Sequence, residues 1–287
     1  MEDFINRAQV LIEAIPYIRT FHGKTFVIKY GGHAMCDREL KHNVMLDIVL
    51  LKFLGLNPVL VHGGGPEITC MLEKTGKKSS RVCGQRVTDR ETMDIVNMVL
   101  AGKINKELVT LLNHYGAKAA GLSGQDGGLL TAAKKKMPGG EDLGFVGEVE
   151  SIRPELLHTL LNKGYIPVMA TVGVGIEGEI YNINADTVAG ELAAALQAEK
   201  LIILTDVEGI YENSQDSYSL ISALKINKAR EMMENGRIEG GMIPKVEACI
   251  HALCHGVGRT HIIDGRRPHS LLLEVLTDKG IGTMVVE

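Results

Sequence analysis

The sequence lacks the features that would place it in a membrane or in an oxidising compartment. No segment approaches the roughly 18 consecutive apolar residues of a transmembrane helix. Its first residues are acidic where a signal peptide would be basic, and no long apolar run follows them. The cysteines are odd in number and show no C-x-x-C spacing: Cys36, Cys70, Cys83, Cys249 and Cys254. We therefore expect reduced thiols in a cytoplasmic protein, with neither a disulfide framework nor a zinc site.

A large excess of charge of either sign is also missing. The 31 basic and 35 acidic residues give a formal net charge of −4, which predicts no nucleic-acid partner and no polybasic membrane patch. The basic run Lys134 to Lys136 precedes the glycines of "MPGGED" and is interpreted as a solvated loop or hairpin. With 45% hydrophobic residues, the 287 positions suffice for one large α/β domain or two smaller ones.

An amphipathic helix is predicted over residues 3–15, ahead of the first strand. Apolar residues recur there at helical spacing, and Pro16 ends or kinks the helix: Phe4, Ala8, Leu11, Ile12 and Ile15. This apolar stripe requires a cover, either the body of the same subunit or another subunit. The pattern alone leaves both alternatives open.

Short apolar runs alternate with amphipathic stretches along the rest of the chain. The runs are "TFVIKY", "NPVLVHG", "AKAAGLSG", "YIPVMATVG", "LIILTDV" and "RTHIIDG". This alternation predicts a mostly parallel sheet covered by helices on both faces, with ligands at the carboxyl ends of its strands. Two segments, "LLTAAKKKMPGGEDLGFVGEVESI" and "GVGIEGEIYNINAD", interrupt it and are interpreted as hairpins near a site.

Two glycine clusters follow strands, in "VIKYGG" (27–32) and "VLVHGGGPE" (59–67). Each is either a tight turn or a phosphate site, because bare backbone N–H groups can approach an anion. Lys29 precedes the first cluster, and Lys245 follows another glycine pair in "GGMIPK". Two such lysines suit phosphoryl transfer, which depends on positioning and charge neutralisation. The alternatives are a solvent-exposed lysine at a strand edge for Lys29 and an ordinary helix-start lysine for Lys245.

Two common nucleotide-binding motifs are excluded. The "GKT" at 23–25 resembles the end of a Walker A loop, but Ile18 stands where its first glycine belongs, and a strand follows. Gly173, Gly175 and Gly178 match G-x-G-x-x-G, yet the next residues alternate like a strand. In a dinucleotide fingerprint a helix begins directly after the glycines. Here we expect the next helix to begin only near Ala185.

Asp186 and Arg86 each have a structural and a functional interpretation. Asp186 follows Asn184, a predicted N-cap, so its charge either complements the helix dipole or holds two lysine ammonium groups together. Arg86 precedes a helix capped by Thr88 or Asp89. It either forms a salt bridge at the helix start or clamps a substrate carboxylate with two hydrogen bonds.

From about residue 16 to residue 287, these segments in their order resemble the amino-acid kinase family. The resemblance rests on "VIKYGGHAM", "NPVLVHGGGPEI", "RVTDRETMDIVNMVLAGKINKELV", "GLSGQDG", "DLGFVGEVESI", "YNINADTVAGELAAAL", "LTDVEGIY", "GGMIPKVEACI" and "HIIDGRRPHSLLLEVLTDKGIGTM". The most similar branch phosphorylates the side-chain carboxylate of N-acetyl-L-glutamate in arginine biosynthesis; other branches lack "RVTD" and "YNINAD" in these settings. The resemblance implies a three-layer α/β/α sandwich with a mostly parallel central sheet.

The resemblance also implies roles for individual residues. ATP is the phosphoryl donor, with Mg²⁺ held largely by the nucleotide phosphates and no metal site formed by the protein. The residues are catalytic Lys29, Lys245 and Asp186; acetylglutamate-binding Gly64, Gly65, Arg86 and Asn182; and nucleotide-binding Gly31, Gly32, Gly63, Thr205 and Asp206.

Domain organisation and regulation follow from the same resemblance. It implies an oligomerisation helix (1–20), a lobe that binds acetylglutamate and forms the dimer (21–180), and an ATP-binding lobe (181–287). Arginine-inhibited members carry such a helix, and these helices interlace three dimers into a hexamer. We therefore expect another subunit to pack against the apolar face of residues 3–15. The expected arginine-binding residues are Tyr17, Glu274 and Gly280. A PII-type signalling protein is a further candidate partner.

Three positions depart from the family pattern. Gln85 stands where leucine is usual, Gln125 replaces a lysine and Thr171 replaces a common proline. They bear on substrate affinity, because none is assigned to catalysis. The rival interpretations are another carboxylate or carbamate kinase and a catalytically inactive arginine sensor. The presence of both lysines and Asp186 argues against the inactive sensor.

Overall fold

The computed structural model describes residues 1–287 except 36, 83, 214–215, 217 and 279, so Cys36 and Cys83 lie outside the described residues. The strand order of its central sheet is β12-β14-β13-β11-β1-β2-β8-β5, and all neighbours pair in parallel apart from β13 with β14. The bounds are β1 (Thr25–Tyr30), β2 (Asn57–His62), β5 (Ala119–Ser123), β8 (Ile166–Ala170), β11 (Lys200–Thr205), β12 (Ala223–Lys225), β13 (Arg259–Asp264) and β14 (Thr283–Val286). The mostly parallel sheet is confirmed.

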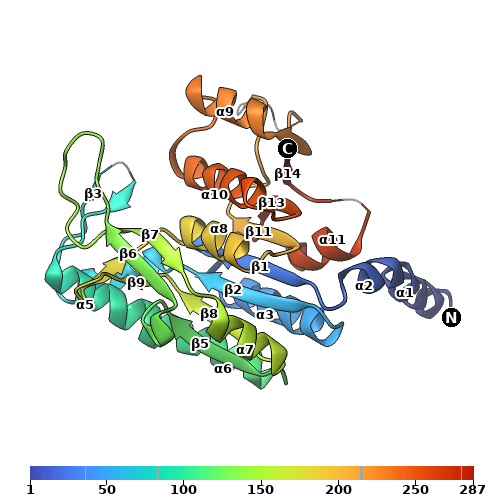
Figure 1. Cartoon of the computed structure of the whole chain (residues 1–287). Coiled ribbons are helices and arrows are strands. Elements are labelled where there is room, and N and C mark those ends of the chain that lie inside the picture. The colour runs from blue at the N-terminus through green and yellow to red at the C-terminus, as the bar shows by residue number, and fades with distance from the viewer. Residues whose placement is uncertain (36, 83, 214–215, 217, 279) are drawn as a thin grey trace.

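Helices cover both faces of this sheet (Figure 1). Alternation along β1 divides the core, because Phe26 and Ile28 face one side and Val27 the other. The first face packs against α3 (Arg38–Phe53), α4 (Gly65–Lys74), α5 (Arg90–Asn97), α6 (Asn105–His114) and α11 (Ser270–Leu276). The second packs against α7 (Glu155–Asn162), α8 (Ala185–Ala195), α9 (Ile226–Glu234) and α10 (Ile243–Cys254). The three-layer architecture is confirmed. Within the described residues, no helix has the length and apolar character needed to cross a membrane.

Both interruptions of the alternation are hairpins, as predicted. The first pairs β6 (Leu130–Lys134) with β7 (Gly147–Ile152), and the second pairs β9 (Val172–Val174) with β10 (Ile180–Asn182). Together they form a separate four-stranded sheet. A third, smaller hairpin joins β3 (Arg81–Val82) to β4 (Gln85–Arg86).

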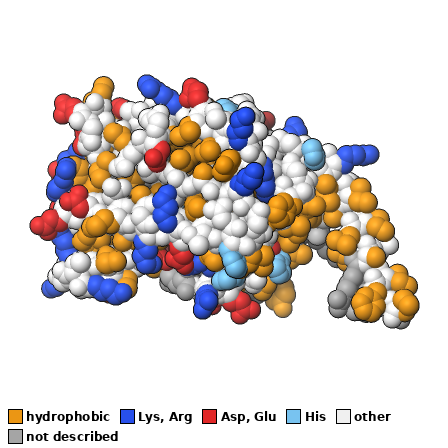
Figure 2. All heavy atoms as spheres, turned by 90° about the horizontal axis from the view of Figure 1, so that it is seen from below, with side chains coloured by type: hydrophobic (Ala, Val, Ile, Leu, Met, Phe, Trp, Pro, Cys, Tyr) orange, Lys and Arg blue, Asp and Glu red, His pale blue; other side chains and the backbone are white. Residues whose placement is uncertain are grey.

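The N-terminal segment is two helices in succession, α1 (Glu2–Glu13) and α2 (Ile15–Phe21). Pro16 stands in the first turn of α2, where its missing N–H costs no hydrogen bond. Helix α1 extends away from the sheet (Figure 1), and Phe4, Leu11, Ile12 and Ile15 are more than half exposed. Figure 2 shows hydrophobic side chains along this projecting arm. Within the described residues, this apolar stripe is therefore largely exposed on the single chain.

The helix that begins at Arg90 contains an irregular turn. Between α5 and α6 lies a π-helical turn, Met98–Ile104, of the kind that often marks functional sites. Its side chains lie against the second glycine cluster, since a Cβ on Gly64 would be 2.3 Å from Ile104 Cδ1 and 2.8 Å from Leu100 Cδ2. Gly64 therefore gives this turn room to approach the end of β2.

Candidate active site

One buried carboxylate holds two lysines together. Lys29 Nζ lies 3.0 Å from Asp186 Oδ1, and Lys245 Nζ lies 2.9 Å from Asp186 Oδ2. Lys29 and Asp186 are only 6% and 4% exposed, because β1 lies in the middle of the sheet. The alternative of a solvent-exposed strand-edge lysine is therefore wrong for Lys29. Three segments far apart in the sequence meet at this cluster.

The first turns of two helices present Asp186 and Lys245. Asn184 caps α8, as predicted, because its side chain accepts hydrogen bonds from the N–H groups of Asp186 (2.8 Å) and Thr187 (3.2 Å). Helices α8 and α10 pack closely, since a Cβ on Gly190 would lie 3.0 Å from the carbonyl oxygen of Ala248. This close packing brings the two first turns side by side.

The charges of the cluster leave a surplus of one cation. Burial lowers the pKa of Lys29, and the attraction of Asp186 only partly offsets this effect. Burial alone would raise the pKa of Asp186, but the two lysines outweigh it and hold that pKa below its ordinary value. Asp186 is therefore ionised at neutral pH, and the cluster favours an additional anion.

A cavity of about 270 Å³ lies beside this cluster. The structure brings around it nearly all the residues that the sequence pattern assigned to substrate and phosphate: Lys29, Gly31, Gly32, Gly63, Gly64, Gly65, Arg86, Asn182 and Asp186. Gly65 is the first residue of α4, so the N-terminal N–H groups of that helix face a place suited to a carboxylate. Gln85 and Thr171, two of the departures from the family pattern, also line this cavity.

Arg86 is held in place by neutral oxygen atoms. Its Nη2 donates to the Gly65 carbonyl (3.0 Å) and to Thr69 Oγ1 (2.7 Å), and its Nη1 donates to Ser79. In the described part of the chain it forms no ion pair, and Asp89 caps α5 instead. Burial, followed by repulsion from Arg81, lowers the pKa of Arg86 to about 10. The guanidinium is thus cationic at neutral pH and lacks a carboxylate partner.

The nucleotide side differs in part from the prediction. The Gly63 N–H donates to the Tyr30 carbonyl (3.2 Å), so it is not directed at a phosphate here. A cavity of about 610 Å³ begins at Val207, directly after Thr205 and Asp206, which are not among its lining residues. Tyr211 and Met242 line it; both lie in segments that carry the family resemblance, but neither was assigned a role from the sequence. A neighbouring cavity of about 500 Å³ joins Gly240 and Gly241 to the lysine cluster, as "GGMIPK" suggested.

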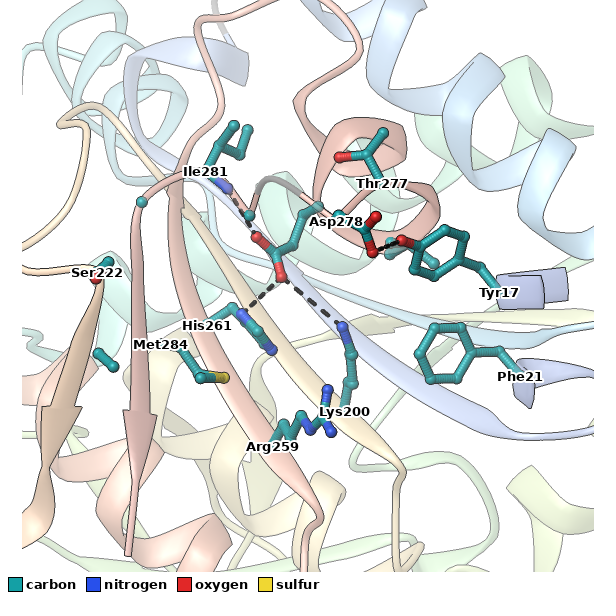
Figure 3. A pocket seen from close by; sticks show the side chains of 15 residues that line it. Tyr17, Phe21, Lys200, Ser222, Arg259, His261, Thr277, Asp278, Ile281 and Met284 are labelled. Carbon is teal, nitrogen blue, oxygen red and sulfur yellow. Dashed lines mark hydrogen bonds and ion pairs between the residues drawn. The ribbon is translucent and has the colours of Figure 1, made fainter. Parts of the chain in front are cut away.

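A further cavity, of about 370 Å³, lies between α2 and the C-terminal segment (Figure 3). Tyr17, Glu274 and Gly280, the predicted effector residues, all line it. Glu274 accepts a hydrogen bond from the Ile281 N–H (3.1 Å) and lies 2.7 Å from His261 Nδ1 and 3.7 Å from Lys200 Nζ. The Tyr17 hydroxyl donates to Asp278, which connects α2 to this cavity.

Comparison with known proteins connects this site to one enzyme family. A model of the amino acid kinase family matches residues 24–264. The acetylglutamate kinase of Desulforamulus reducens is 59% identical over 282 residues, which cover 98% of both chains. That of Moorella thermoacetica is 59% identical over 289 residues, again 98% of both chains.

A solved structure supports the same assignment. The N-acetylglutamate synthase of Neisseria gonorrhoeae, complexed with coenzyme A and N-acetyl-glutamate, matches with a TM-score of 0.86 at 27% identity. The match covers 98% of the present chain and 63% of the synthase chain. The same synthase complexed with coenzyme A and L-arginine matches with a TM-score of 0.81 at 26% identity, covering 97% of this chain and 65% of the synthase chain. From its fold, its buried lysine pair and these relatives, the chain belongs to the amino acid kinase family, among the acetylglutamate kinases.

Proposed function

We propose that the chain transfers the γ-phosphoryl group of ATP to the side-chain carboxylate of N-acetyl-L-glutamate. The products are ADP and N-acetyl-glutamyl 5-phosphate, in the second step of arginine biosynthesis, in the cytoplasm. The observation that carries the proposal is the pair of lysines on Asp186, at the edge of a cavity that also holds Arg86.

In this proposal the chain supplies position and charge. The acceptor carboxylate is ionised at neutral pH, so its oxygen attacks the γ-phosphorus without a general base. Negative charge then accumulates on the transferred group and on the leaving ADP oxygen, where ammonium groups stabilise it. Lys29 on the acetylglutamate side and Lys245 on the nucleotide side provide these ammonium groups. Asp186 keeps the two cations together against their mutual repulsion.

Binding of the two substrates divides between the halves of the chain. Residues 21–180 carry Arg86, Gly64 and Gly65 toward acetylglutamate, with Asn182 just beyond them. Residues 181–287 carry the cavity that begins at Val207, which we assign to the nucleoside together with the adjoining Thr205 and Asp206. The phosphates then lie near Gly31 and Gly32, beside Lys29.

Magnesium is proposed to enter with ATP. Among the described residues, no three histidine, cysteine or acidic side chains are grouped so that they could hold a metal ion. Asp186 is already balanced by two lysines. The nucleotide phosphates are therefore the expected ligands, and the ion would neutralise part of their charge.

A coupled assay of ADP release tests this function. N-acetyl-L-glutamate, glutamate, aspartate and carbamate are compared as acceptors at the same ATP concentration. We expect turnover with N-acetyl-L-glutamate at least ten times faster than with the others. Carbamate has no second carboxylate for Arg86, and the α-ammonium groups of glutamate and aspartate would lie beside that cation, where N-acetyl-L-glutamate has a neutral amide. Preference for carbamate or aspartate would favour another kinase of this fold, and absence of any turnover would favour an arginine sensor.

Replacing Arg86 with lysine is expected to raise the KM for N-acetyl-L-glutamate while leaving kcat nearly unchanged. The change removes a paired hydrogen bond to a carboxylate, and bonds to charged groups contribute about 1.5–3 kcal/mol, or roughly 10- to 100-fold in KM. Steady-state kinetics measure both constants. The control is Arg153→Lys, an exposed arginine outside the cavity. An unchanged KM would remove Arg86 from substrate binding.

We also propose feedback inhibition by arginine at the cavity of Figure 3. Two carboxylates of its lining, those of Glu274 and Asp278, would bind the guanidinium group of arginine. The ammonium group of Lys200 would bind its α-carboxylate. Lys200 Nζ lies 5.1 Å from the centre of the Phe21 ring, so helix α2 contacts this charged group directly. Support also comes from the synthase relative, which was solved with L-arginine. A PII-type protein that relieves this inhibition is a further proposed partner.

Deleting residues 1–15 is expected to convert a hexamer into dimers and to weaken arginine inhibition. The deletion removes the exposed stripe of α1 and keeps Tyr17 and Phe21 at the cavity. Light scattering measures the assembly, and ADP release measures inhibition. As a control, Ile176→Glu changes an apolar residue that is 93% exposed elsewhere and should preserve the hexamer. A truncated chain that remains hexameric would refute the role of α1.

A further inference from the structure

His62 is a buried titratable residue that the proposed reaction does not use. It ends β2, directly before the second glycine cluster, and is fully buried. Its Nδ1 lies 3.0 Å from the carbonyl oxygen of Gly63, and its Nε2 lies 3.2 Å from Asn105 Nδ2. The side chain thus contacts the backbone that lines the acetylglutamate cavity, without facing that cavity itself.

The surroundings of Asn105 determine which ring nitrogen of His62 carries the proton. Asn105 Nδ2 donates to the carbonyls of Val168 (2.8 Å) and Leu122 (3.3 Å), while Oδ1 accepts from Lys106 Nζ (3.2 Å). The amide can adopt only this orientation. Its nitrogen carries two hydrogens: one is donated to Val168, and the other is shared between the Leu122 carbonyl and His62 Nε2 at similar distances (3.3 and 3.2 Å). This nitrogen cannot accept a hydrogen bond from His62. Nε2 must therefore accept, and the proton lies on Nδ1, from which it is donated to Gly63.

Other features of the site support this arrangement. Burial lowers the pKa of His62 to about 4, so the ring stays neutral at physiological pH. Asn105 directly follows the π-helical turn whose Leu100 and Ile104 lie against Gly64. A Cβ on Gly121 would be 1.9 Å from Asn105 Oδ1, so the glycine in β5 makes room for the amide.

Fixing the Gly63 carbonyl also fixes the next N–H group. In a trans peptide, the C=O of one residue and the N–H of the next point in opposite directions, and no described peptide bond is cis. The Gly63 carbonyl is drawn toward the buried ring, so the Gly64 N–H points away from it. Among the described residues this N–H has no hydrogen-bond partner, and Gly64 lines the acetylglutamate cavity.

We propose that His62, held by Asn105, is a positioning residue that directs the Gly64 N–H at the carboxylate that accepts the phosphoryl group. This inference rests on the proposed function. The N–H would stabilise charge on the reacting oxygens, and it costs no reorganisation because its direction is set before the substrate binds.

Two amide substitutions separate this role from simple packing. In His62→Asn, the amide nitrogen can take the place of Nδ1 and still donate to Gly63. In His62→Gln, the amide lies one bond farther out, near the place of Nε2, and Gly63 loses its donor. We expect His62→Gln to lower kcat by about 10- to 100-fold, less than the loss of an entire oxyanion donor, and His62→Asn to stay within about 3-fold of wild type. The KM for ATP should not change in either variant.

Three readouts make the outcome decisive. Wild-type ADP release with N-acetyl-L-glutamate is measured first, so a failure of the proposed function is seen separately. Thermal unfolding shows whether each variant is folded, and the exposed His158→Gln is the control for the same chemical change. If His62→Gln does not fold, the nitrogen-15 shifts of the histidine rings in wild type decide, and a proton on Nε2 of His62 would overturn the proposal. Equal kcat values for folded His62→Asn and His62→Gln would also overturn it.

Discussion

Replacing Lys245 with alanine is expected to lower kcat by about 10³-fold, with little change in thermal stability. Its ammonium group lies in the first turn of α10, 2.9 Å from Asp186 and at the wall of the cavity that adjoins the nucleotide side. A cation at a transferred phosphoryl group acts mainly in the transition state, where removal of a single such group costs about 10²- to 10⁵-fold.

The readout is kcat at saturating ATP and N-acetyl-L-glutamate, together with the melting temperature. Stability should be kept because Asp186 retains Lys29 as its partner. The matched control is Lys228→Ala on α9, a lysine that forms a surface pair with Glu231, and this variant should leave kcat unchanged. A near-normal kcat in Lys245→Ala would remove this lysine from the mechanism.

Asp186→Asn is expected to impair both activity and folding. Two cations would then share a buried site without a counter-charge, and breaking a buried ion pair in this way costs about 3–5 kcal/mol. We expect kcat to fall by at least as much as in Lys245→Ala, because both lysines lose their position. Denaturant unfolding measures the stability, and Asp142→Asn, which breaks an exposed pair with Lys134, is the control with little expected effect.

The stability difference between wild type and Asp186→Asn should depend on pH, which provides a second check. The pKa of Asp186 in the folded protein is held below its ordinary value of 3.8. Its contribution to stability is therefore complete above that value and is lost as the pH falls through the folded pKa. The stability difference between wild type and Asp186→Asn should be constant near neutral pH and decrease below about pH 4. A difference that grows on acidification would contradict this account.

The sequence was sufficient to predict the layers of the fold and the place of the candidate site. Apolar runs ending in glycine or aspartate predict parallel strands, and the carboxyl ends of such strands meet, so Lys29 and the two glycine clusters were expected at one edge. The N-cap Asn184 was predicted because its side chain acts on the next two residues alone. Local interactions of this kind can be read directly from a sequence.

Features that depend on packing between distant segments could not be predicted from the sequence. Nothing in the helical pattern after Arg90 distinguishes a π-helical turn, which here coincides with the close approach of Ile104 to Gly64. The interaction of His62 with Asn105 joins residues 43 positions apart. The Gly63 N–H was predicted to bind a phosphate. In the structure it donates a hydrogen bond to the carbonyl of Tyr30, the last residue of β1.

The central claim is that the two lysines on Asp186 serve phosphoryl transfer to a carboxylate. Trapping with hydroxylamine tests it most directly, because an acyl phosphate reacts to give a hydroxamate while a phosphate ester or free phosphate does not. With N-acetyl-L-glutamate and ATP, we predict one hydroxamate for each ADP released, and almost none with Lys245→Ala. Release of ADP by the wild-type chain without hydroxamate would contradict the account.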